Sequence, residues 1–182
     1  MIRAYKGVWP RLGERVYVDV SAQVIGQVEL GDHASVWMNA VIRGDVNVIR
    51  IGAGTNVQDN CVVHVFRADH PTSIGEEVTV GHSVTLHGCT IGPRCLIGMG
   101  ATILNDAEVG EECIIAAGTL VPERMKIPPR RLVMGLPARI RRELTAEERE
   151  GLRRSAANYI EYKETYLQEA APPGRPRTGE AP

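Results

Sequence analysis

LGDHASVWMNAVI, residues 30–42, carries a large aliphatic side chain at every sixth position, and this spacing predicts the fold. Leu30, Val36 and Ile42 mark the step, and a small residue, Ala34 or Ala40, stands two positions before the next aliphatic. A period of 2 would predict an ordinary strand and a period of 3.6 a helix, and neither fits this spacing. A short repeat that persists along a chain indicates a repeat architecture, which outranks local propensity.

The same step continues through most of the chain. Its further aliphatic positions are Val18, Val24, Ile51, Val57, Val63, Ile74, Val80, Leu86, Ile91, Ile97, Ile103, Val109, Ile115 and Val121. The step is broken between 42 and 51, between 63 and 74, and between 86 and 91. We expect loops that protrude from the fold at these breaks, and such loops are where function usually lies.

Each six-residue unit predicts a short strand followed by a tight corner, with the aliphatic side chain pointing inward. Three strands close a triangular coil, and successive coils stack about 4.8 Å apart. About 18 units then give about six coils of an all-β fold, a left-handed parallel β-helix. A β-sandwich of short strands is the alternative, but it needs hairpin turns such as Asn-Gly or Asp-Gly. The sequence contains neither dipeptide.

The repeat stops after Val121, and the C-terminal part has a different pattern. Thr145-Ala-Glu-Glu148 is a capping box, and apolar residues follow it at helical spacing. We therefore expect an α-helix at about 145–169, packed on a face of the prism or on a neighbouring subunit. Residues 1–170 would form a single domain, and residues 171–182 lack the composition for a core and are expected to be mobile.

Composition limits the functional classes. The 182 residues are 43% hydrophobic, and the formal net charge of −1 provides no basic field for nucleic acid or anionic lipid. The sequence has no apolar run of membrane-spanning length and no visible signal peptide, so we expect a cytoplasmic protein. The four cysteines have neither CxxC spacing nor a secretory context, which favours buried small hydrophobic residues over zinc fingers or disulfides.

Three histidines fall in the central coils: His64, His82 and His87. His64 and His82 are 18 residues apart, which is one full coil if the 63–74 stretch adds no face. His64 and His87 directly follow inward aliphatics and should therefore point outward. Side chains on a convex solid diverge, so these imidazoles could share one ion only if a neighbouring molecule contributed part of the set. Three imidazoles suit Zn²⁺ with a fourth position for water, whereas surface or interface histidines are the alternative.

The motifs around these histidines resemble the γ-class carbonic anhydrase family over residues 8–168. They are Arg43-Gly-Asp45, Asn56-Val-Gln58-Asp59, Cys61-Val-Val-His64, Gly81-His82-Ser83 and Leu86-His87-Gly88. The resemblance implies a homotrimer with a metal site at each subunit interface. It implies that His64 and His87 of one subunit and His82 of its neighbour bind Zn²⁺. Imidazole also accepts Fe²⁺ or Co²⁺.

Further roles follow from the same resemblance. Arg43 and Asp45 match a pair that links subunits, and Asn56 and Gln58 match positions that line the site. The implied activity is the reversible hydration of CO₂ to bicarbonate, with a metal-bound hydroxide as the nucleophile.

The chain departs from the family where a proton acceptor is expected. The best-known members carry an acidic residue on a long loop after the first ligand, but here Val65–Ser73 is short and has Asp69 as its one acid. Another family glutamate is replaced by Val46. His70 and Tyr159 are two candidate substitutes for the missing proton shuttle.

A second resemblance involves the motif Met134-Gly-Leu-Pro-Ala-Arg139, which is similar to the end of the solenoid in hexapeptide acyltransferases. A transferase or thioesterase that uses an acyl-CoA is therefore an alternative on the same scaffold, because fold alone does not settle function. A non-catalytic assembly protein that retains a metal is the other alternative.

Overall fold

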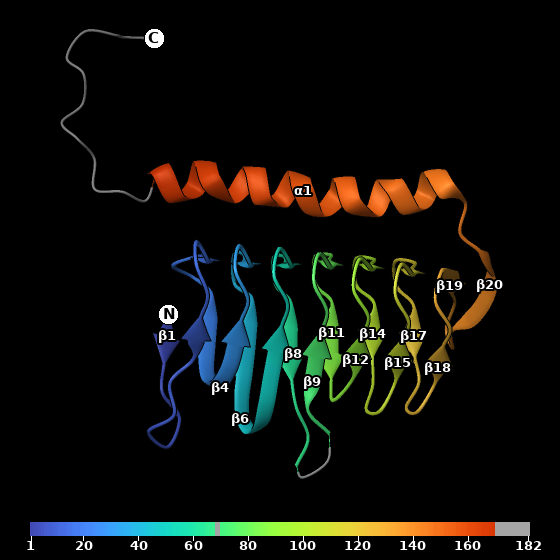
Figure 1. The fold of residues 1–182 in the computed structure, drawn as a ribbon. Helices are drawn as coiled ribbons and strands as arrows, with labels where there is room; N and C mark the ends of the chain where they lie inside the picture. Colours follow the sequence, from blue (N-terminus) through green and yellow to red (C-terminus); the bar gives the residue numbers. More distant parts are fainter. Residues whose placement is uncertain (68–69, 170–182) are drawn as a thin grey trace, which may run out of the picture.

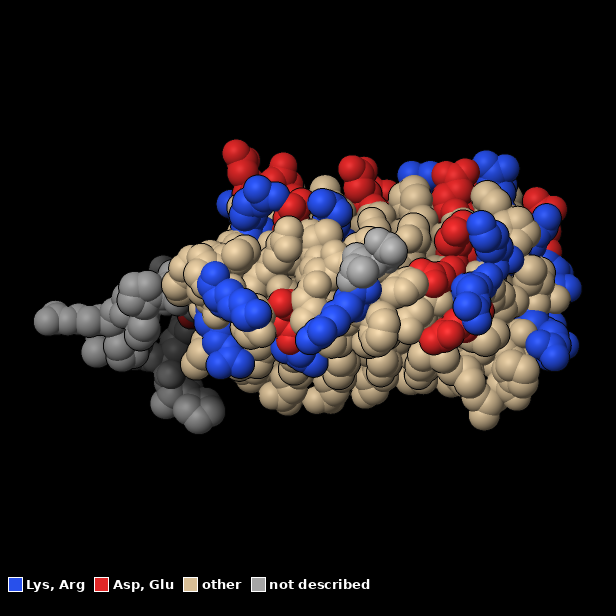
Figure 2. Space-filling model, turned by 90° about the horizontal axis from the view of Figure 1, so that it is seen from below, with Lys and Arg blue, Asp and Glu red and all other residues tan. Residues whose placement is uncertain are grey.

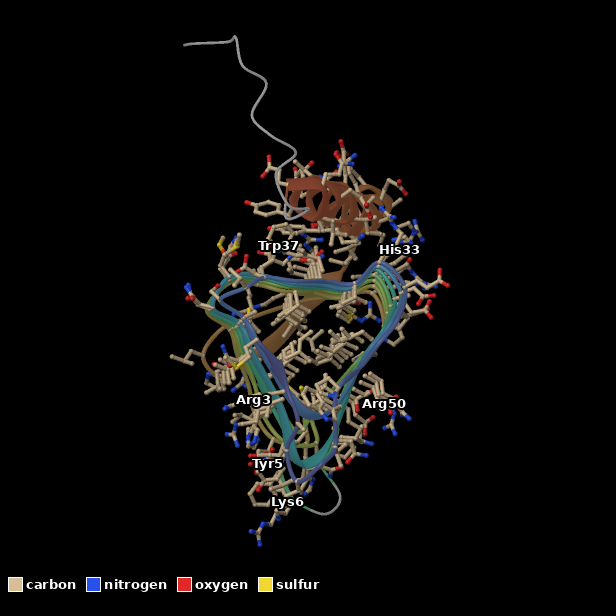
Figure 3. All side chains as sticks on the ribbon, turned by 90° about the vertical axis from the view of Figure 1, so that its left-hand side faces the viewer. Arg3, Tyr5, Lys6, His33, Trp37 and Arg50 are labelled. Carbon is tan, nitrogen blue, oxygen red and sulfur yellow. The ribbon has the colours of Figure 1, made fainter. Side chains whose placement is uncertain are left out.

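The computed structural model describes residues 1–67 and 70–169. The chain winds into a triangular prism of about 7 turns with one long helix against it, which confirms the predicted left-handed β-helix (Figure 1). The predicted six coils were about one too few, because the solenoid continues past Val121, where Ile127 and Val133 keep the inward step. Viewed along the prism, the aliphatic side chains fill the interior of the triangle (Figure 3). Between Val24 and Val121, every aliphatic residue that was predicted to point inward is at most 3% exposed. The six-residue period therefore located the core.

The first face of the prism is an eight-stranded sheet, and α1 lies against it. Its strands are parallel except the last pair, β19 and β20, which is antiparallel. The strands are β3 (Tyr17–Val18), β5 (Ser35–Val36), β7 (Asn56–Val57), β10 (Thr79–Val80), β13 (Leu96–Ile97), β16 (Ile114–Ile115), β19 (Arg131–Met134) and β20 (Arg139–Glu143).

The other two faces belong to a single twelve-stranded sheet. The second face holds β8 (Val62–His64), β11 (Thr85–His87), β14 (Thr102–Ile103) and β17 (Leu120–Val121). The third face holds β9 (Thr72–Ile74), β12 (Thr90–Ile91), β15 (Glu108–Val109) and β18 (Lys126–Ile127). Two long strands continue across both faces, and two short N-terminal strands pair with the first of them: β4 (Gln23–Leu30), β6 (Val41–Ile51), β1 (Ile2–Arg3) and β2 (Arg11–Leu12).

One of the three breaks in the repeat is a protruding loop. Residues 65–67 and 70–71 leave the prism between β8 and β9 (Figure 1). The break between 42 and 51 is instead absorbed inside strand β6, where the register with β4 shifts after Gly44, so the expectation of a loop there was wrong. The break between 86 and 91 is a tight corner at Gly88, whose φ of 58° lies in the left-handed region that glycine adopts without steric cost.

The C-terminal helix, α1 (Ala146–Glu169), begins with the predicted capping box. The Thr145 hydroxyl accepts a bond from the Glu148 amide at 3.1 Å, and the Glu148 carboxylate accepts one from the Thr145 amide at 2.9 Å. The helix runs back along the first face (Figure 1) and buries Leu152, Ala156 and Lys163. The Lys163 ammonium is fully enclosed and is paired with Glu164. The predicted mobile tail, 171–182, lies outside the described residues.

Glu112 fastens the start of α1 to the prism. Its carboxylate is 4% exposed and forms ion pairs with Arg149 and Arg153 of the helix and with Arg94 and Arg130 of the solenoid. Desolvation raises the pKa of Glu112, but the Arg149 hydrogen bond and the surrounding guanidinium charges outweigh it, so the pKa lies below its usual value. The ionised form is therefore the one that holds the helix in place.

The surface carries both signs of charge. On the edge of the prism opposite α1, acidic and basic side chains are interspersed (Figure 2). No helix within residues 1–67 or 70–169 combines the length and apolarity needed to cross a membrane. The four cysteines are free and buried, which agrees with the interpretation of them as small core residues.

Candidate metal centre

Two of the candidate histidines form a pair on the second face. His64 ends β8 and His87 ends β11, and the parallel register places them directly side by side. His64 Nδ1 lies 3.1 Å from His87 Nε2, and the ring centroids are 5.1 Å apart. Both side chains point out of the prism because each follows a fully buried inward residue, Val63 or Leu86.

The other nitrogen of each ring is held by an oxygen. His64 Nε2 lies 2.9 Å from Asp45 Oδ1, and His87 Nδ1 lies 2.7 Å from Asn105 Oδ1. The orientation of the Asn105 amide is fixed because its nitrogen donates to Glu123 Oε1 at 3.1 Å. The oxygens of Asp45 and Asn105 accept hydrogen bonds, so the nitrogens that face them, His64 Nε2 and His87 Nδ1, must carry protons. If both imidazoles are neutral, the remaining nitrogens, His64 Nδ1 and His87 Nε2, point their lone pairs at each other. This arrangement needs a proton or a cation between the rings.

Asp45 connects this pair to Arg43. The Arg43 guanidinium pairs with Asp45 Oδ2 while His64 holds Oδ1, so both oxygens of the carboxylate are engaged. Desolvation raises the pKa of Asp45, but the hydrogen bonds from His64 and Arg43 outweigh it and lower the pKa overall. Arg43 and Asp45, expected at a subunit interface, thus contact each other within one protomer and hold the orientation of His64.

His82 does not stack on His64. The residue beside His64 in the next coil is His87, which is 23 residues further along. The expected 18-residue register was wrong because the stretch from Val63 to Ile74 is longer than one six-residue step but leads only from one face to the next. His82 lies at the corner before β11, whereas His87 ends that strand, so an extended strand holds the two imidazoles at opposite ends of one side of the triangle.

His82 nevertheless shows the same pattern of partners. Its Nδ1 lies 2.8 Å from Asp59 Oδ2, which leaves the Nε2 lone pair available. Among residues 1–67 and 70–169, no cluster of three or more His, Cys, Asp or Glu side chains is placed to hold a metal ion. The candidate ligands of one chain therefore lie in two separate places, the His64–His87 pair and His82, each of which is a candidate half-site.

Gln58 and Asn56 belong to the His82 half-site. Gln58 and His82 line the same cavity of about 220 Å³. Asn56 is fully buried, and its oxygen accepts a bond from Gln58 Nε2 at 3.0 Å while its nitrogen donates to Thr79 Oγ1 at 3.2 Å. Thr79 Oγ1 in turn lies 3.1 Å from Ser155 Oγ on α1. Asn56 thus orients the Gln58 side chain through this hydrogen bond, and of the two residues Gln58 lines the cavity.

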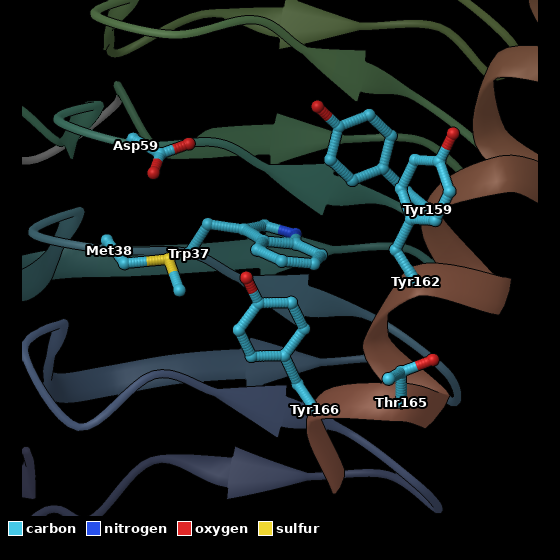
Figure 4. Close-up of a pocket in the computed structure, with 7 residues that line it drawn as sticks. All are labelled: Trp37, Met38, Asp59, Tyr159, Tyr162, Thr165 and Tyr166. Carbon is cyan, nitrogen blue, oxygen red and sulfur yellow. The ribbon is translucent and has the colours of Figure 1, made fainter. Parts of the chain in front are cut away.

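Tyr159, one of the two proposed proton acceptors, lies on α1 near the same half-site. It lines a pocket together with Asp59, the partner of His82 (Figure 4). Burial is the main cause of the raised pKa of Tyr159, and the negative charge of Asp59 adds to it. The ring also packs edge-on against Trp37, with centroids 5.4 Å apart.

His70, the other candidate, lies beside the His64–His87 pair. Its Nδ1 is 2.5 Å from Asp106 Oδ1. The Phe66 ring is near both imidazoles, with its centroid 5.6 Å from that of His70 and 6.4 Å from that of His87. Asp69, the one acid of this loop, lies outside the described residues.

Comparisons with known proteins agree with this architecture. A family model described as bacterial transferase hexapeptide (six repeats) matches residues 88–123. A carbonic anhydrase of Geobacillus kaustophilus is 41% identical over 91% of this chain and 91% of its own. The mitochondrial gamma carbonic anhydrase 1 of Arabidopsis thaliana is 43% identical over 90% of this chain and 62% of its own. This chain belongs to the γ-class carbonic anhydrase family.

Structural similarity extends to proteins described in other terms. The crystal structure of a hexapeptide transferase family protein from Anaplasma phagocytophilum superposes with a TM-score of 0.88 and 40% identity. The alignment covers 92% of this chain and 98% of that chain. The γ-class carbonic anhydrase scaffold is therefore shared with proteins that are grouped with transferases.

Sequence reasoning did not find the outer partners of the histidines in this γ-class chain. Asn105 was not singled out, although its position 18 residues after His87 is one regular coil further on. Asp59 was quoted only as part of a motif, and its bond to His82 is visible only in the structure. The repeat length would have been enough to place Asn105 beside His87.

Proposed function

We propose that the protein is a metal-dependent carbonic anhydrase, a lyase that interconverts CO₂ and bicarbonate. One observation carries the metal site: His64 Nδ1 and His87 Nε2 face each other at 3.1 Å while their other nitrogens face oxygen acceptors. Metal-binding histidines typically donate their second N–H to a carboxylate or an amide oxygen, which fixes the tautomer and the ring orientation. Family membership supports the same activity.

The donor set fits a divalent transition metal. Two nitrogens bound at about 2.0–2.1 Å to a tetrahedral zinc ion would lie roughly 3.3 Å apart, close to the 3.1 Å between His64 and His87. Imidazole is also a ligand for Fe²⁺ and Co²⁺, and metal availability often decides among them. Zn²⁺ is the proposed metal, with Fe²⁺ or Co²⁺ as substitutes.

The third ligand would be His82 of a neighbouring subunit. The two half-sites of one protomer lie at opposite ends of one side of the triangle, and each is incomplete alone. A cyclic trimer would bring the His82 corner of one subunit against the His64–His87 pair of the next. Three equivalent sites would follow, and Arg43 and Asp45 would lie at the same interfaces.

Residues of the chain would orient the reacting oxygen atoms and remove the proton. When bound, the metal supplies Lewis-acid activation of water at neutral pH. Gln58, held by Asn56, offers a polar group beside His82 to orient the reacting oxygen atoms. The protein must then remove one proton in each hydration cycle. His70, with its Nδ1 held by Asp106, is the proposed proton acceptor. Tyr159 on α1 keeps its hydroxyl proton at neutral pH because its pKa is raised, so its proposed part is to relay a proton, donating its own as it accepts another.

Metal analysis paired with stopped-flow CO₂ hydration tests this proposal, on protein prepared anaerobically with zinc and with iron. The His64→Ala and His82→Ala variants should each lose metal and activity. Co-expression of the two variants should restore both in part. A site is intact when a His82→Ala subunit supplies the His64–His87 pair and its neighbour, a His64→Ala subunit, supplies His82. With the two variants mixed equally and at random, about a quarter of the interfaces have this combination.

The controls separate metal binding from assembly. Each variant alone should keep the native oligomeric state by sedimentation, so that loss of metal is not loss of the trimer. If the co-expressed variants recover no metal, the ligands do not come from neighbouring subunits. Full metal occupancy without CO₂ hydration above buffer would instead favour the non-catalytic assembly protein.

An acyl-CoA-dependent transferase or thioesterase is the second candidate. Its support is the structural similarity to a hexapeptide transferase family protein and the Met134–Arg139 motif, which connects β19 and β20. This activity would be independent of metal. Stabilisation against heating by acetyl-CoA, with none from bicarbonate, would favour it over CO₂ hydration.

A further inference from the structure

A pocket of about 400 Å³ opens between α1 and the first face, next to the His82 half-site (Figure 4). Its volume is within the range of small-molecule sites. The helix and the solenoid both contribute to its walls, which are Trp37, Met38, Asp59, Tyr159, Tyr162, Thr165 and Tyr166. None of the residues discussed as metal ligands belongs to this lining.

Aromatic rings form most of the pocket wall, and they hold one another in place. Trp37 meets Tyr159 and Tyr166 nearly edge-on, with centroids 5.4 and 5.2 Å apart. Tyr162 packs against Tyr159 at 5.5 Å and is 50% exposed at the outside of the pocket. Trp37 is 5% exposed, and its indole N–H donates to Ser35 Oγ at 3.0 Å. The indole is therefore fixed, and the pocket does not depend on the ordering of a loose side chain.

The charge of the pocket is negative. Asp59 is the one charged residue of the lining, and no Lys, Arg or His belongs to it. Asp59 Oδ2 accepts the bond from His82, whereas Oδ1 has no hydrogen-bond partner among the described residues. Aromatic faces carry negative charge density and attract cations, most strongly where water is excluded. An anionic ligand would meet neither a basic side chain nor a favourable field here.

We propose that this pocket binds a small organic ammonium cation. The cation would lie against the aromatic rings with its charge toward Asp59 Oδ1. A quaternary ammonium group fits this chemistry because its apolar surface contacts the rings while its charge is shared with the carboxylate. The inference is independent of the metal proposal, because it requires neither a bound metal nor catalysis.

Binding of choline tests the proposal, with the neutral isostere 3,3-dimethyl-1-butanol as the matched ligand. The experiment uses the full-length Trp9→Phe variant. Trp37 is then its one tryptophan, so the intrinsic fluorescence reports on the pocket. At constant ionic strength, choline should change this fluorescence saturably and bind at least about tenfold more tightly than the neutral alcohol. Equal affinity for the two ligands, or no saturation with choline, would overturn the proposal.

Three variants locate the site. Tyr162→Leu removes a half-exposed ring and should weaken choline binding at least about fivefold. Asp59→Asn keeps the shape, removes the charge, and should bring choline affinity close to that of the alcohol. Tyr5→Leu, at another exposed tyrosine outside the pocket (37% exposed, against 50% for Tyr162), should leave binding unchanged. Choline binding that survives both Tyr162→Leu and Asp59→Asn would refute the assignment to this pocket.

Discussion

His64 Nδ1 lies 3.1 Å from His87 Nε2, although the two residues are 23 positions apart in the chain. The parallel pairing of β8 with β11 brings them together, and Asp45 and Asn105 hold their outer nitrogens. Each ring is therefore oriented by a neighbour, and the facing nitrogens are left with lone pairs. This relationship makes several properties of the protein testable.

Asn105 should control metal affinity without being a ligand. Asn105→Ala removes the oxygen that holds His87 Nδ1, so we expect metal to bind about 10–100-fold more weakly, measured by competition with a chelator. Glu123→Gln is the matched control, because it keeps an oxygen acceptor for the Asn105 amide. Unchanged metal affinity in Asn105→Ala would remove the orienting role.

Gly88 should be intolerant of a side chain for a steric reason. An added Cβ would lie 2.5 Å from Asn105 Oδ1 and 3.2 Å from the Cβ of His70. Gly88→Ala should therefore displace Asn105 and weaken metal binding, in addition to the cost of about 1–2 kcal/mol for alanine in the left-handed region. Gly100→Ala has a similar φ of 68° with open space around it, so it should show the backbone cost in thermal melts and keep metal affinity.

His70 should determine the buffer dependence of turnover. His70→Ala removes the imidazole that Asp106 holds beside the His64–His87 pair. We expect CO₂ hydration at low buffer concentration to fall at least about tenfold and to recover when imidazole buffer is added. Metal content should remain at the wild-type level. Turnover that responds to buffer as the wild type does would exclude His70 as a proton acceptor.

Glu112 should stabilise the docking of α1. Glu112→Gln leaves four arginines facing a neutral amide, so we expect a loss of about 1.5–3 kcal/mol in the free energy of unfolding, measured by denaturant titration. Glu111 is 37% exposed and pairs with Arg94 and Arg130, so Glu111→Gln should cost less than about 1 kcal/mol. Equal effects of the two substitutions would contradict the special role of Glu112.

The same carboxylate should make stability depend on pH. The pKa of Glu112 is lower in the folded protein than in an unfolded chain, where it is about 4.3. Its contribution is therefore fully present above about pH 5 and is lost as the pH falls through the lower, folded-state value. In thermal melts from pH 7 to pH 3, the difference between wild type and Glu112→Gln should shrink toward acid. A constant difference over this range would show that ionisation of Glu112 is not involved.

The fold could be predicted from local sequence, because each six-residue unit specifies one strand and one corner. The inward positions from Val24 to Val121, the corner residues and the capping box at Thr145 all follow from spacing and residue type. The three candidate histidines were also visible in the sequence, and the outward direction of His64 and His87 follows from their positions after Val63 and Leu86.

Which of these residues contact one another depends on how the coils stack in three dimensions. The length of an irregular segment does not tell how many faces it covers, so the sequence could not show that His64 stacks on His87 and that His82 stands at the other end of the strand. The contact of Asp59 with His82 spans the same irregular segment, so it too could not be placed from the repeat length. The aromatic pocket forms because α1 folds back over Trp37 and brings Tyr159 against it. These segments are more than 100 residues apart, so no local sequence pattern predicts their contact.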